Sequence, residues 1–257
     1  MARPMLPARV LLPLLALASA CLTLPAAAET LVVYGATGAI GHLIVQEALD
    51  RGDTVVGVSP DPAKLAKLAI TNARYKGVTG DVTDPASFAA VTRGADAVII
   101  SVSGSGKGNL PQNSVIARAA KTAVADCTGK ARCPYILQIG GATTMYGDKA
   151  AMLAHLPFPA APGSPMYGML LGHLDALNTY RASNIRWTVL TPPLDIEGWS
   201  FNAAPVLHRT GRYRTSTTDF VRDSSGKSRI NVADLAVAAV DEVHQQRFVG
   251  KRFTVGY

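Results

Sequence analysis

Hydrophobic and polar positions alternate in a regular way along this chain. From Thr30 onward, short runs of β-branched residues are separated by alanine-rich stretches in which apolar positions recur at helical spacing. This alternation is typical of a parallel sheet with helices on both faces. We expect strands at residues 31–34, 54–58, 74–76, 97–101, 135–139, 187–190 and about 252–255. The pattern therefore predicts an α/β fold, a doubly wound parallel sheet in three layers within a single domain.

The expected helices fill the gaps between these strands. Asp61 precedes Pro62 and Asp84 precedes Pro85, and each pair places a capping acid ahead of a proline at the first helical position. Longer helices are expected at about residues 111–124, 166–183 and 232–245.

Two stretches interrupt the alternation, residues 140–165 and 192–228, and both are rich in Gly, Pro, Thr and aromatic residues. Each follows the carboxyl end of a predicted strand, the edge at which open α/β sheets bind ligands. We expect irregular loops on the substrate side, with surface cover as the alternative. Their side chains Met145, Tyr146, Trp199 and Phe201 are expected to wall an apolar pocket for a planar or aromatic substrate.

The first 28 residues have the pattern of a secretory signal peptide. Arg3 and Arg9 precede an apolar stretch that ends in three alanines, so we expect cleavage after Ala28, export to a bacterial periplasm and a mature domain of residues 29–257. A cut before Cys21, with a lipid anchor there, is the lesser alternative. No stretch is long enough for a membrane span.

Composition and charge narrow the function classes. Apolar residues make up 48% and charged residues 17%, which excludes a disordered chain or a coiled coil. The formal charge is +7, but the basic residues are dispersed, which argues against nucleic acid as a partner. Without the leader, Cys127 and Cys133 are the remaining thiols, and an oxidising compartment predicts a disulfide between them. Two unrelated thiols are the alternative, and we expect no metal site.

A glycine-rich turn follows the first strand directly and opens a helix. It comprises Gly35, Thr37, Gly38, Ala39, Ile40 and Gly41, with Ala36 between the first two. Glycines allow a tight turn and a close approach of the backbone to a pyrophosphate, whose charge then rests on free N–H groups at the helix start. The strand, turn and helix together predict a dinucleotide-binding site.

With this turn the chain resembles the atypical short-chain dehydrogenase/reductase proteins that have an NAD(P)H-binding domain, the group of biliverdin reductase B and the NmrA-like proteins. The likeness also rests on residues 80–84, 96–100, 183–192 and 232–235. It implies a Rossmann-like fold. Position by position, it implies Asp81 and Val82 near the adenine, Ser101 and Val102 beside the ribose, Gly140 and Gly141 near the nicotinamide ribose, and Pro192 near the nicotinamide. The plain alternatives are a turn cap for Asp81 and strand ends for Ser101 and Pro192.

The end of the second strand bears on the choice between NADP and NAD. Similar NADP-binding proteins often carry an arginine where this chain has Ser59, but Ser59 can still donate to a phosphate and Lys64 is close by. No acid occupies the strand end, and we expect Asp61 to act as a helix cap. We therefore expect NADP, with NAD possible as cofactor.

The usual catalytic pair of short-chain dehydrogenases is incomplete here. Tyr167 is followed four residues later by Leu171, where the family pattern has lysine. His173 lies where the resemblance to biliverdin reductase B implies an active-site histidine, and an imidazole near its normal pKa could donate a proton. A histidine beside the buried stripe of a helix is the alternative for His173, and a space-filling aromatic is the alternative for Tyr167.

These observations predict an NAD(P)-dependent oxidoreductase that transfers hydride from NADPH to a small conjugated or aromatic acceptor, flavin-like or quinone-like. One alternative is a non-catalytic NAD(P)-binding or interaction protein of the bacterial envelope. Another is an isomerase or epimerase that keeps its NAD throughout the cycle. Monomer and dimer are both left open.

Overall fold

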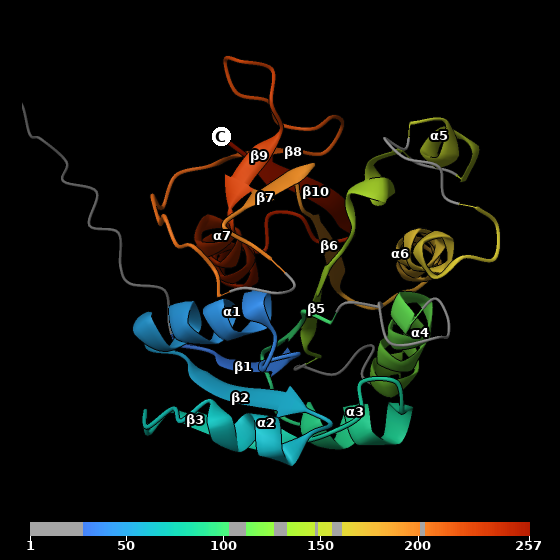
Figure 1. Ribbon diagram of the computed structural model, residues 1–257. Helices are drawn as coiled ribbons and strands as arrows, with labels where there is room; N and C mark the ends of the chain where they lie inside the picture. Colours follow the sequence, from blue (N-terminus) through green and yellow to red (C-terminus); the bar gives the residue numbers. More distant parts are fainter. Residues whose placement is uncertain (1–27, 103–111, 126–132, 147–148, 156–160, 201–203) are drawn as a thin grey trace, which may run out of the picture.

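The protein folds around one large, mostly parallel sheet, seen in the computed structural model of Figure 1. The structure describes residues 28–102, 112–125, 133–146, 149–155, 161–200 and 204–257. The eight strands lie in the order β3-β2-β1-β4-β5-β6-β10-β8. They are β1 (Thr30–Tyr34), β2 (Thr54–Ser59), β3 (Tyr75–Thr79), β4 (Ala97–Ile100), β5 (Tyr135–Ile139), β6 (Trp187–Thr191), β8 (Arg214–Ser216) and β10 (Lys251–Gly256).

Helices follow most of the parallel strands. They are α1 (Ala39–Asp50), α2 (Pro62–Lys67), α3 (Pro85–Val91), α4 (Gln112–Ala125), α5 (Lys149–Ala154), α6 (Pro165–Arg181) and α7 (Val232–Gln245), with the 3₁₀ helix η1 (Ala142–Tyr146). Asp61 and Asp84 cap α2 and α3 through two backbone N–H groups each. The strand order runs outward in one direction from β1 to β3 and in the other from β4 to β6. The carboxyl ends of the parallel neighbours β1 and β4 therefore form the switch point at which such sheets bind ligands.

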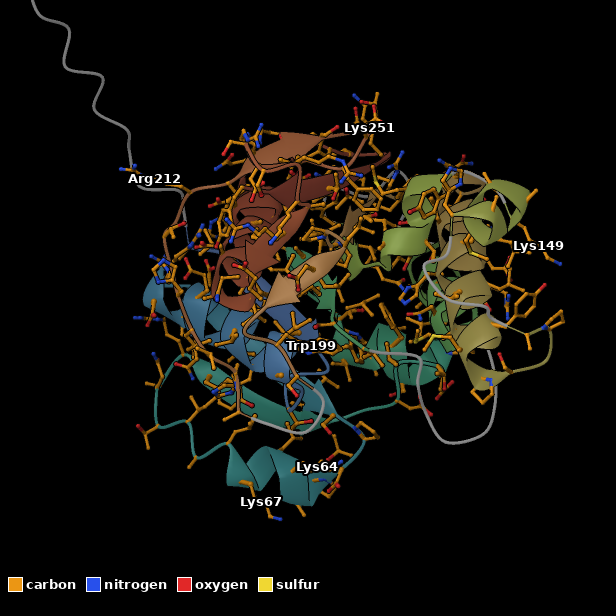
Figure 2. All side chains as sticks on the ribbon, turned by 45° about the horizontal axis from the view of Figure 1, so that its top comes forward. Lys64, Lys67, Lys149, Trp199, Arg212 and Lys251 are labelled. Carbon is orange, nitrogen blue, oxygen red and sulfur yellow. The ribbon has the colours of Figure 1, made fainter. Side chains whose placement is uncertain are left out.

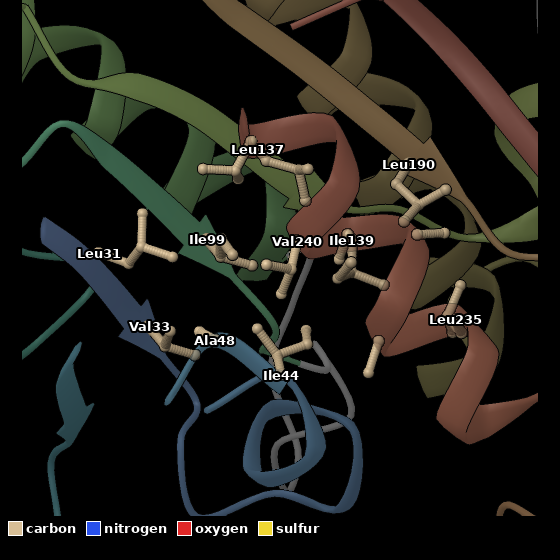
Figure 3. Packing of buried hydrophobic residues seen from close by; sticks show 14 of the residues in the cluster. Leu31, Val33, Ile44, Ala48, Ile99, Leu137, Ile139, Leu190, Leu235 and Val240 are labelled. Atoms are coloured by element: carbon tan, nitrogen blue, oxygen red, sulfur yellow. The ribbon is translucent and has the colours of Figure 1, made fainter. Parts of the chain in front are cut away.

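Neighbouring residues of each central strand point to opposite faces, and both faces are buried. Leu31 and Val33 pack with α1 and α7, whereas Val32 and Tyr34 pack with α3, α4 and α6 on the other side. Figure 3 shows the first of these layers, in which Ile44 of α1 and Val240 of α7 meet the strand residues. Burial on both faces explains why these strands read as continuous apolar runs.

The predicted Rossmann-like, three-layer α/β fold is confirmed. The strand expected at residues 74–76 instead spans Tyr75–Thr79, because β3 pairs in parallel with β2 along its whole length. The two irregular stretches contain more structure than the pattern indicated. Residues 140–165 include η1 and α5, and residues 192–228 include β7 (Asp195–Glu197) and β8. β7 pairs with β9 (Arg229–Asn231), and β8 adds the one antiparallel edge of the described sheet.

The second of these stretches is fastened to two helices by buried carboxylates. Asp234 of α7 is fully buried and accepts hydrogen bonds from Thr210 N at 2.9 Å and Gly211 N at 2.8 Å. Glu47 of α1 accepts from Arg209 Nη2 at 2.8 Å and Nε at 3.0 Å, and also pairs with Arg51. The loop after β7 therefore runs along α1 in a defined position.

Three expectations concern residues outside the described ranges: the signal peptide with Cys21, the Cys127 half of the disulfide, and Phe201. Among the helices that the structure describes, none is long and apolar enough to cross a bilayer.

Candidate functional site

The glycine turn between β1 and α1 is built around contacts that leave no room for a side chain at two positions. A Cβ on Gly35 would lie 2.2 Å from the carbonyl oxygen of Ser101, and Gly35 has a φ of +79°. A Cβ on Gly41 would lie 2.1 Å from the carbonyl oxygen of Gly35. These two glycines bring α1 against β1 and the turn against the end of β4, so they are required by packing.

Gly38 has a different environment. It is exposed, it has extended backbone angles, and a Cβ there would meet only the Gly35 carbonyl oxygen at 3.3 Å. As the N-cap of α1 it provides no side chain, so the N–H groups of the first turn, at Ala39, Ile40 and Gly41, carry no side-chain cap. An uncapped helix start that the chain leaves accessible suits a pyrophosphate group.

The end of β2 lies next to this turn. Ser59 is buried, and its Oγ lies 3.5 Å from Thr37 Oγ1 and accepts from Asp61 N at 3.2 Å. Asp61 caps α2 by accepting from Ala63 N and Lys64 N, which confirms the helix-cap interpretation. Lys64 is exposed on α2, and Figure 2 shows it with Lys67 on the same short helix. Lys64 is thus an exposed cation in the first turn of the helix that follows β2.

The ends of β3 and β4 hold four more predicted residues. Asp81 is exposed, and its Oδ1 accepts from Thr83 N at 2.8 Å and Thr83 Oγ1 at 2.7 Å, so it closes the turn after β3. Val82 is half-buried and packs against the α3 and α4 side of the core. Ser101 continues the ladder of β4 through Ser101 N to Tyr34 O, and its carbonyl covers Gly35 together with Val102.

The carboxyl ends of β5 and β6 lie beside each other in the same sheet. Gly140 donates its N–H to Leu190 O at 2.8 Å, and a Cβ there would lie 2.7 Å from Val189 Cγ1. Pro192 follows β6 and is buried. The nearby hydroxyls are engaged elsewhere: Thr144 Oγ1 lies 2.6 Å from Thr191 Oγ1, and Thr143 Oγ1 donates to Leu170 O. Both threonine hydroxyls therefore have hydrogen-bond partners within the protein.

His173 of α6 lies directly against the end of β5. A Cβ on Gly141 would be 2.6 Å from His173 Cδ2, so the glycine makes room for the imidazole ring. On one side His173 Nε2 is 3.3 Å from Asn113 Nδ2 of α4. On the other side Nδ1 is buried and has no hydrogen-bond partner among the described residues. An unpaired buried polar atom costs about 1–3 kcal/mol, a cost that none of the described residues offsets at Nδ1.

Burial changes the chemistry that His173 can perform. It lowers the pKa of His173 to about 4, so the imidazole is neutral at pH 7. The expectation of a normal pKa, and of an imidazolium that gives up a proton at neutral pH, is therefore wrong. A neutral imidazole can still donate a hydrogen bond through its one N–H.

The lowered pKa predicts a pH-dependent stability. Because the pKa is about 4 when folded and about 6.5 when unfolded, the unfolded chain binds more protons between these values. The contribution of the neutral His173 to stability is therefore fully present above pH 6.5, and about 3 kcal/mol of it is lost as the pH drops to 4. Urea unfolding of wild type and His173→Gln across this range measures the difference. We expect the exposed His208→Gln control to keep the wild-type slope, and an unchanged slope in His173→Gln would contradict the lowered pKa.

Tyr167 does not lie with His173. It is in the first turn of α6, about 9 Å along the helix axis from His173, and Lys149 Nζ of α5 lies 5.6 Å from the centre of its ring. Lys149 has a raised pKa because of its contact with the Tyr167 hydroxyl. A cation thus reaches Tyr167 from another helix, but Figure 2 shows Lys149 at the outer edge of the molecule, far from Trp199.

The residues that were predicted to wall the acceptor pocket lie on two separate segments, η1 and the loop after β7. Met145 contacts Arg252, and Tyr146 stacks on His155 at 5.0 Å and meets Phe220 edge-on. Trp199 lies on the loop after β7, which the Arg209–Glu47 contact holds along α1. Next to Trp199, the backbone at Gly198 passes very close to the backbone at Val206. Gly198 has a φ of +76°, and a Cβ there would lie 1.9 Å from Val206 O, so this approach requires a glycine.

Sequence reasoning missed Asn113 and Gln138, the buried amides next to His173. Asn113 is fully buried, Gln138 is 1% exposed, and Gln138 Nε2 donates to Asn113 Oδ1 at 3.2 Å. Gln138 interrupts the apolar run of β5 between Leu137 and Ile139. A polar residue inside a buried strand was the one signal that could have pointed to a buried network.

Several known proteins are similar to this chain in sequence and in fold. The chain is 27% identical to a candidate exported protein of Burkholderia pseudomallei, whose crystal structure matches 89% of this chain and 100% of that one with a TM-score of 0.69. A candidate NADH-flavin reductase of Streptococcus pneumoniae is 23% identical, with a TM-score of 0.67 over 89% of this chain and 99% of that one. The uncharacterized protein YwnB of Bacillus subtilis is 24% identical over 87% of this chain and 96% of its own length.

The family match begins at the glycine turn and covers α1 and most of the site. Residues 35–243 match the NAD(P)H-binding family, a span that begins at Gly35 and includes His173. Membership of this family implies an NAD(P) cofactor, and the glycine cradle and the uncapped start of α1 fit one. The chain therefore belongs to the NAD(P)H-binding family.

Proposed function

We propose that this protein is an NADPH-dependent oxidoreductase that reduces a small conjugated or aromatic acceptor of flavin or quinone type. The observation that carries the proposal is the glycine turn at the switch point between β1 and β4. Its two packed glycines and its exposed, uncapped Gly38 form a cradle for a dinucleotide.

The cofactor would extend along the carboxyl edge of the sheet. Gly38 and the first turn of α1 would hold the pyrophosphate, Asp81 and Val82 would lie near the adenine, and Ser101 with Val102 would border the ribose. Gly140, Gly141 and Pro192 would face the nicotinamide end. Lys64 favours NADP over NAD, because it is an exposed cation near the end of β2 and the nearby acid Asp61 is occupied as a helix cap.

Bound NADPH would supply a hydride, two electrons and one proton, to the acceptor. His173 would donate a hydrogen bond through its N–H to an oxygen of the acceptor, which stabilises negative charge as the hydride arrives. Since burial keeps His173 neutral, the second proton of the reduced acceptor would come from water. Flavins and quinones suit this scheme because hydride transfer to them depends mainly on positioning. The description of the Streptococcus pneumoniae relative agrees with a flavin acceptor.

The cellular setting that we propose follows the leader pattern: export, cleavage after Ala28, and a Cys127–Cys133 disulfide in the mature protein. The Burkholderia pseudomallei relative, described as a candidate exported protein, agrees with this setting. The alternative to an enzyme is a non-catalytic NAD(P)-binding protein. It is favoured by the absence of the Tyr–Lys spacing of short-chain dehydrogenases, since Leu171 follows Tyr167 at that distance.

The test is a turnover assay on residues 29–257 with NADPH and either FMN or 1,4-naphthoquinone, followed by the loss of reduced nicotinamide absorbance. We expect turnover with at least one acceptor and a decrease in kcat/KM of about tenfold or more in His173→Ala, as for loss of one hydrogen bond to developing charge. His208→Ala changes an exposed histidine and should keep the wild-type rate. NADPH binding without turnover of either acceptor would instead favour the non-catalytic protein.

A further inference from the structure

A chain of buried polar side chains connects the core of α6 to the ring of His173. Tyr180 OH donates to Gln138 Oε1 at 2.7 Å, Gln138 Nε2 donates to Asn113 Oδ1 at 3.2 Å, and Asn113 Nδ2 reaches His173 Nε2 at 3.3 Å. Tyr180 and Asn113 are fully buried, and Gln138 is 1% exposed. This hydrogen-bonded series begins at Tyr180 on α6, passes through β5 and α4, and ends at His173, also on α6.

The direction of these hydrogen bonds determines which ring nitrogen carries the proton. The Tyr180 hydroxyl occupies Gln138 Oε1, so the amide nitrogen of Gln138 faces Asn113 Oδ1. The amide nitrogen of Asn113 therefore faces His173, and it can only donate. His173 Nε2 must accept this bond, so in the neutral imidazole the proton lies on Nδ1. Nδ1 is the buried atom that has no partner among the described residues.

We propose that Asn113 is a positioning residue that holds His173 as a neutral Nδ1–H donor for a carbonyl-type oxygen of the hydride acceptor. This inference rests on the proposed function and makes its acceptor class more specific: a molecule with a conjugated carbonyl oxygen, as in flavins and quinones. Gln138 and Tyr180 support Asn113 from behind. The hydride from NADPH would add to the ring of the acceptor, and the carbonyl oxygen of the acceptor would gain negative charge. His173 would keep its proton, and water would supply the proton that completes the reduced acceptor.

Burial of three polar groups would be costly if they served packing alone. Amides inside a core must have their hydrogen bonds satisfied, and apolar side chains of similar size would fill the same space without that requirement. Here each amide has a hydrogen-bond partner, and among the described residues the His173 end of the series is left with Nδ1 unpaired. Gly141 allows the ring to lie there, since a Cβ would displace it. The arrangement therefore orients one donor.

The test is the tautomer of His173 in residues 29–257 labelled with ¹⁵N-histidine, read from long-range ¹H–¹⁵N correlation spectra without ligand. The signals of His173 are those lost in His173→Gln. We expect a protonated Nδ1 and an unprotonated Nε2 in the wild type at neutral pH. In Asn113→Asp the carboxylate can only accept, so the proton should move to Nε2. Asn178→Asp makes the same change on the exposed face of α6 and should leave the His173 signals unchanged.

Several outcomes would overturn the proposal. A wild-type proton on Nε2 would do so, and this measurement needs no variant, so a failure of Asn113→Asp to fold leaves the test intact. An unchanged tautomer in folded Asn113→Asp would also overturn it. FMN or 1,4-naphthoquinone, added with NADP⁺, should shift the Nδ1 signal, and no shift with either would refute the assigned ligand. Failure of NADPH to bind, measured separately by fluorescence, would reject the proposed function while the tautomer assignment stood.

Discussion

Replacement of Gly41 by alanine is expected to destabilise the protein by about 3 kcal/mol or more. The new Cβ would lie 2.1 Å from the carbonyl oxygen and 2.7 Å from the carbonyl carbon of Gly35, both backbone atoms that cannot rotate away. Relief requires that α1 move from β1, against the packing of Ile44 and Ala48 in the core. A loss of this size is a large part of the stability of an ordinary domain.

The matched control is Gly168→Ala in α6, where a Cβ meets no atom within 4 Å. Glycine to alanine inside a helix normally stabilises by up to about 1 kcal/mol, so the same substitution should have opposite signs in the two helices. Urea unfolding of the three proteins measures both effects. If Gly41→Ala is as stable as wild type, the contact between the turn and α1 is not as the structure describes it.

Replacement of Gly38 by valine is expected to remove nucleotide binding and leave the fold intact. The backbone there is extended, with φ −84° and ψ 161°, and an added Cβ meets a single atom, at 3.3 Å. The valine methyl groups would stand over the first-turn N–H groups of α1 and keep a pyrophosphate away from them. We expect the Kd for NADPH to rise about a hundredfold or more, equivalent to about 2.7 kcal/mol.

Nicotinamide fluorescence measures this loss, and urea unfolding shows whether stability stays within about 1 kcal/mol of wild type, as for most exposed substitutions. Gly168→Val introduces the same side chain on α6, away from the turn, and should bind NADPH as the wild type does. Equal affinities of Gly38→Val and wild type would show that the cofactor does not approach this part of the turn. Within this one turn, Gly38 is thus expected to serve nucleotide binding and Gly41 the stability of the fold.

The fold was predictable because its signals are local. Strand periodicity located β1, β2, β4, β5, β6 and β10 to within two residues, and the Asp–Pro pairs marked the starts of α2 and α3. The glycine turn was visible for the same reason, since strand, turn and helix are consecutive. The short strands β7, β8 and β9 were missed, because each has three residues and owes its existence to pairing with a distant partner.

The candidate site could be predicted only in part, because its chemistry depends on contacts between distant residues. His173 was found by resemblance, but its low pKa comes from burial, which no spacing reveals. Asn113 lies 60 positions from His173 and meets it only because α4 and α6 pack side by side. Lys149 reaches Tyr167 from α5 in the same way, through tertiary structure and not through helical spacing.

The most direct test of the central claim is a titration of residues 29–257 with NADPH, NADH, NADP⁺ and NAD⁺, followed by nicotinamide fluorescence and thermal unfolding. We expect saturable binding at one site, a lower Kd for NADPH than for NADH because of Lys64, and a Tm that rises with nucleotide concentration. At a free concentration one hundred times the Kd, binding should add about 2.7 kcal/mol to stability. Failure of all four nucleotides to bind or to raise the Tm would contradict the claim that the glycine turn holds a dinucleotide.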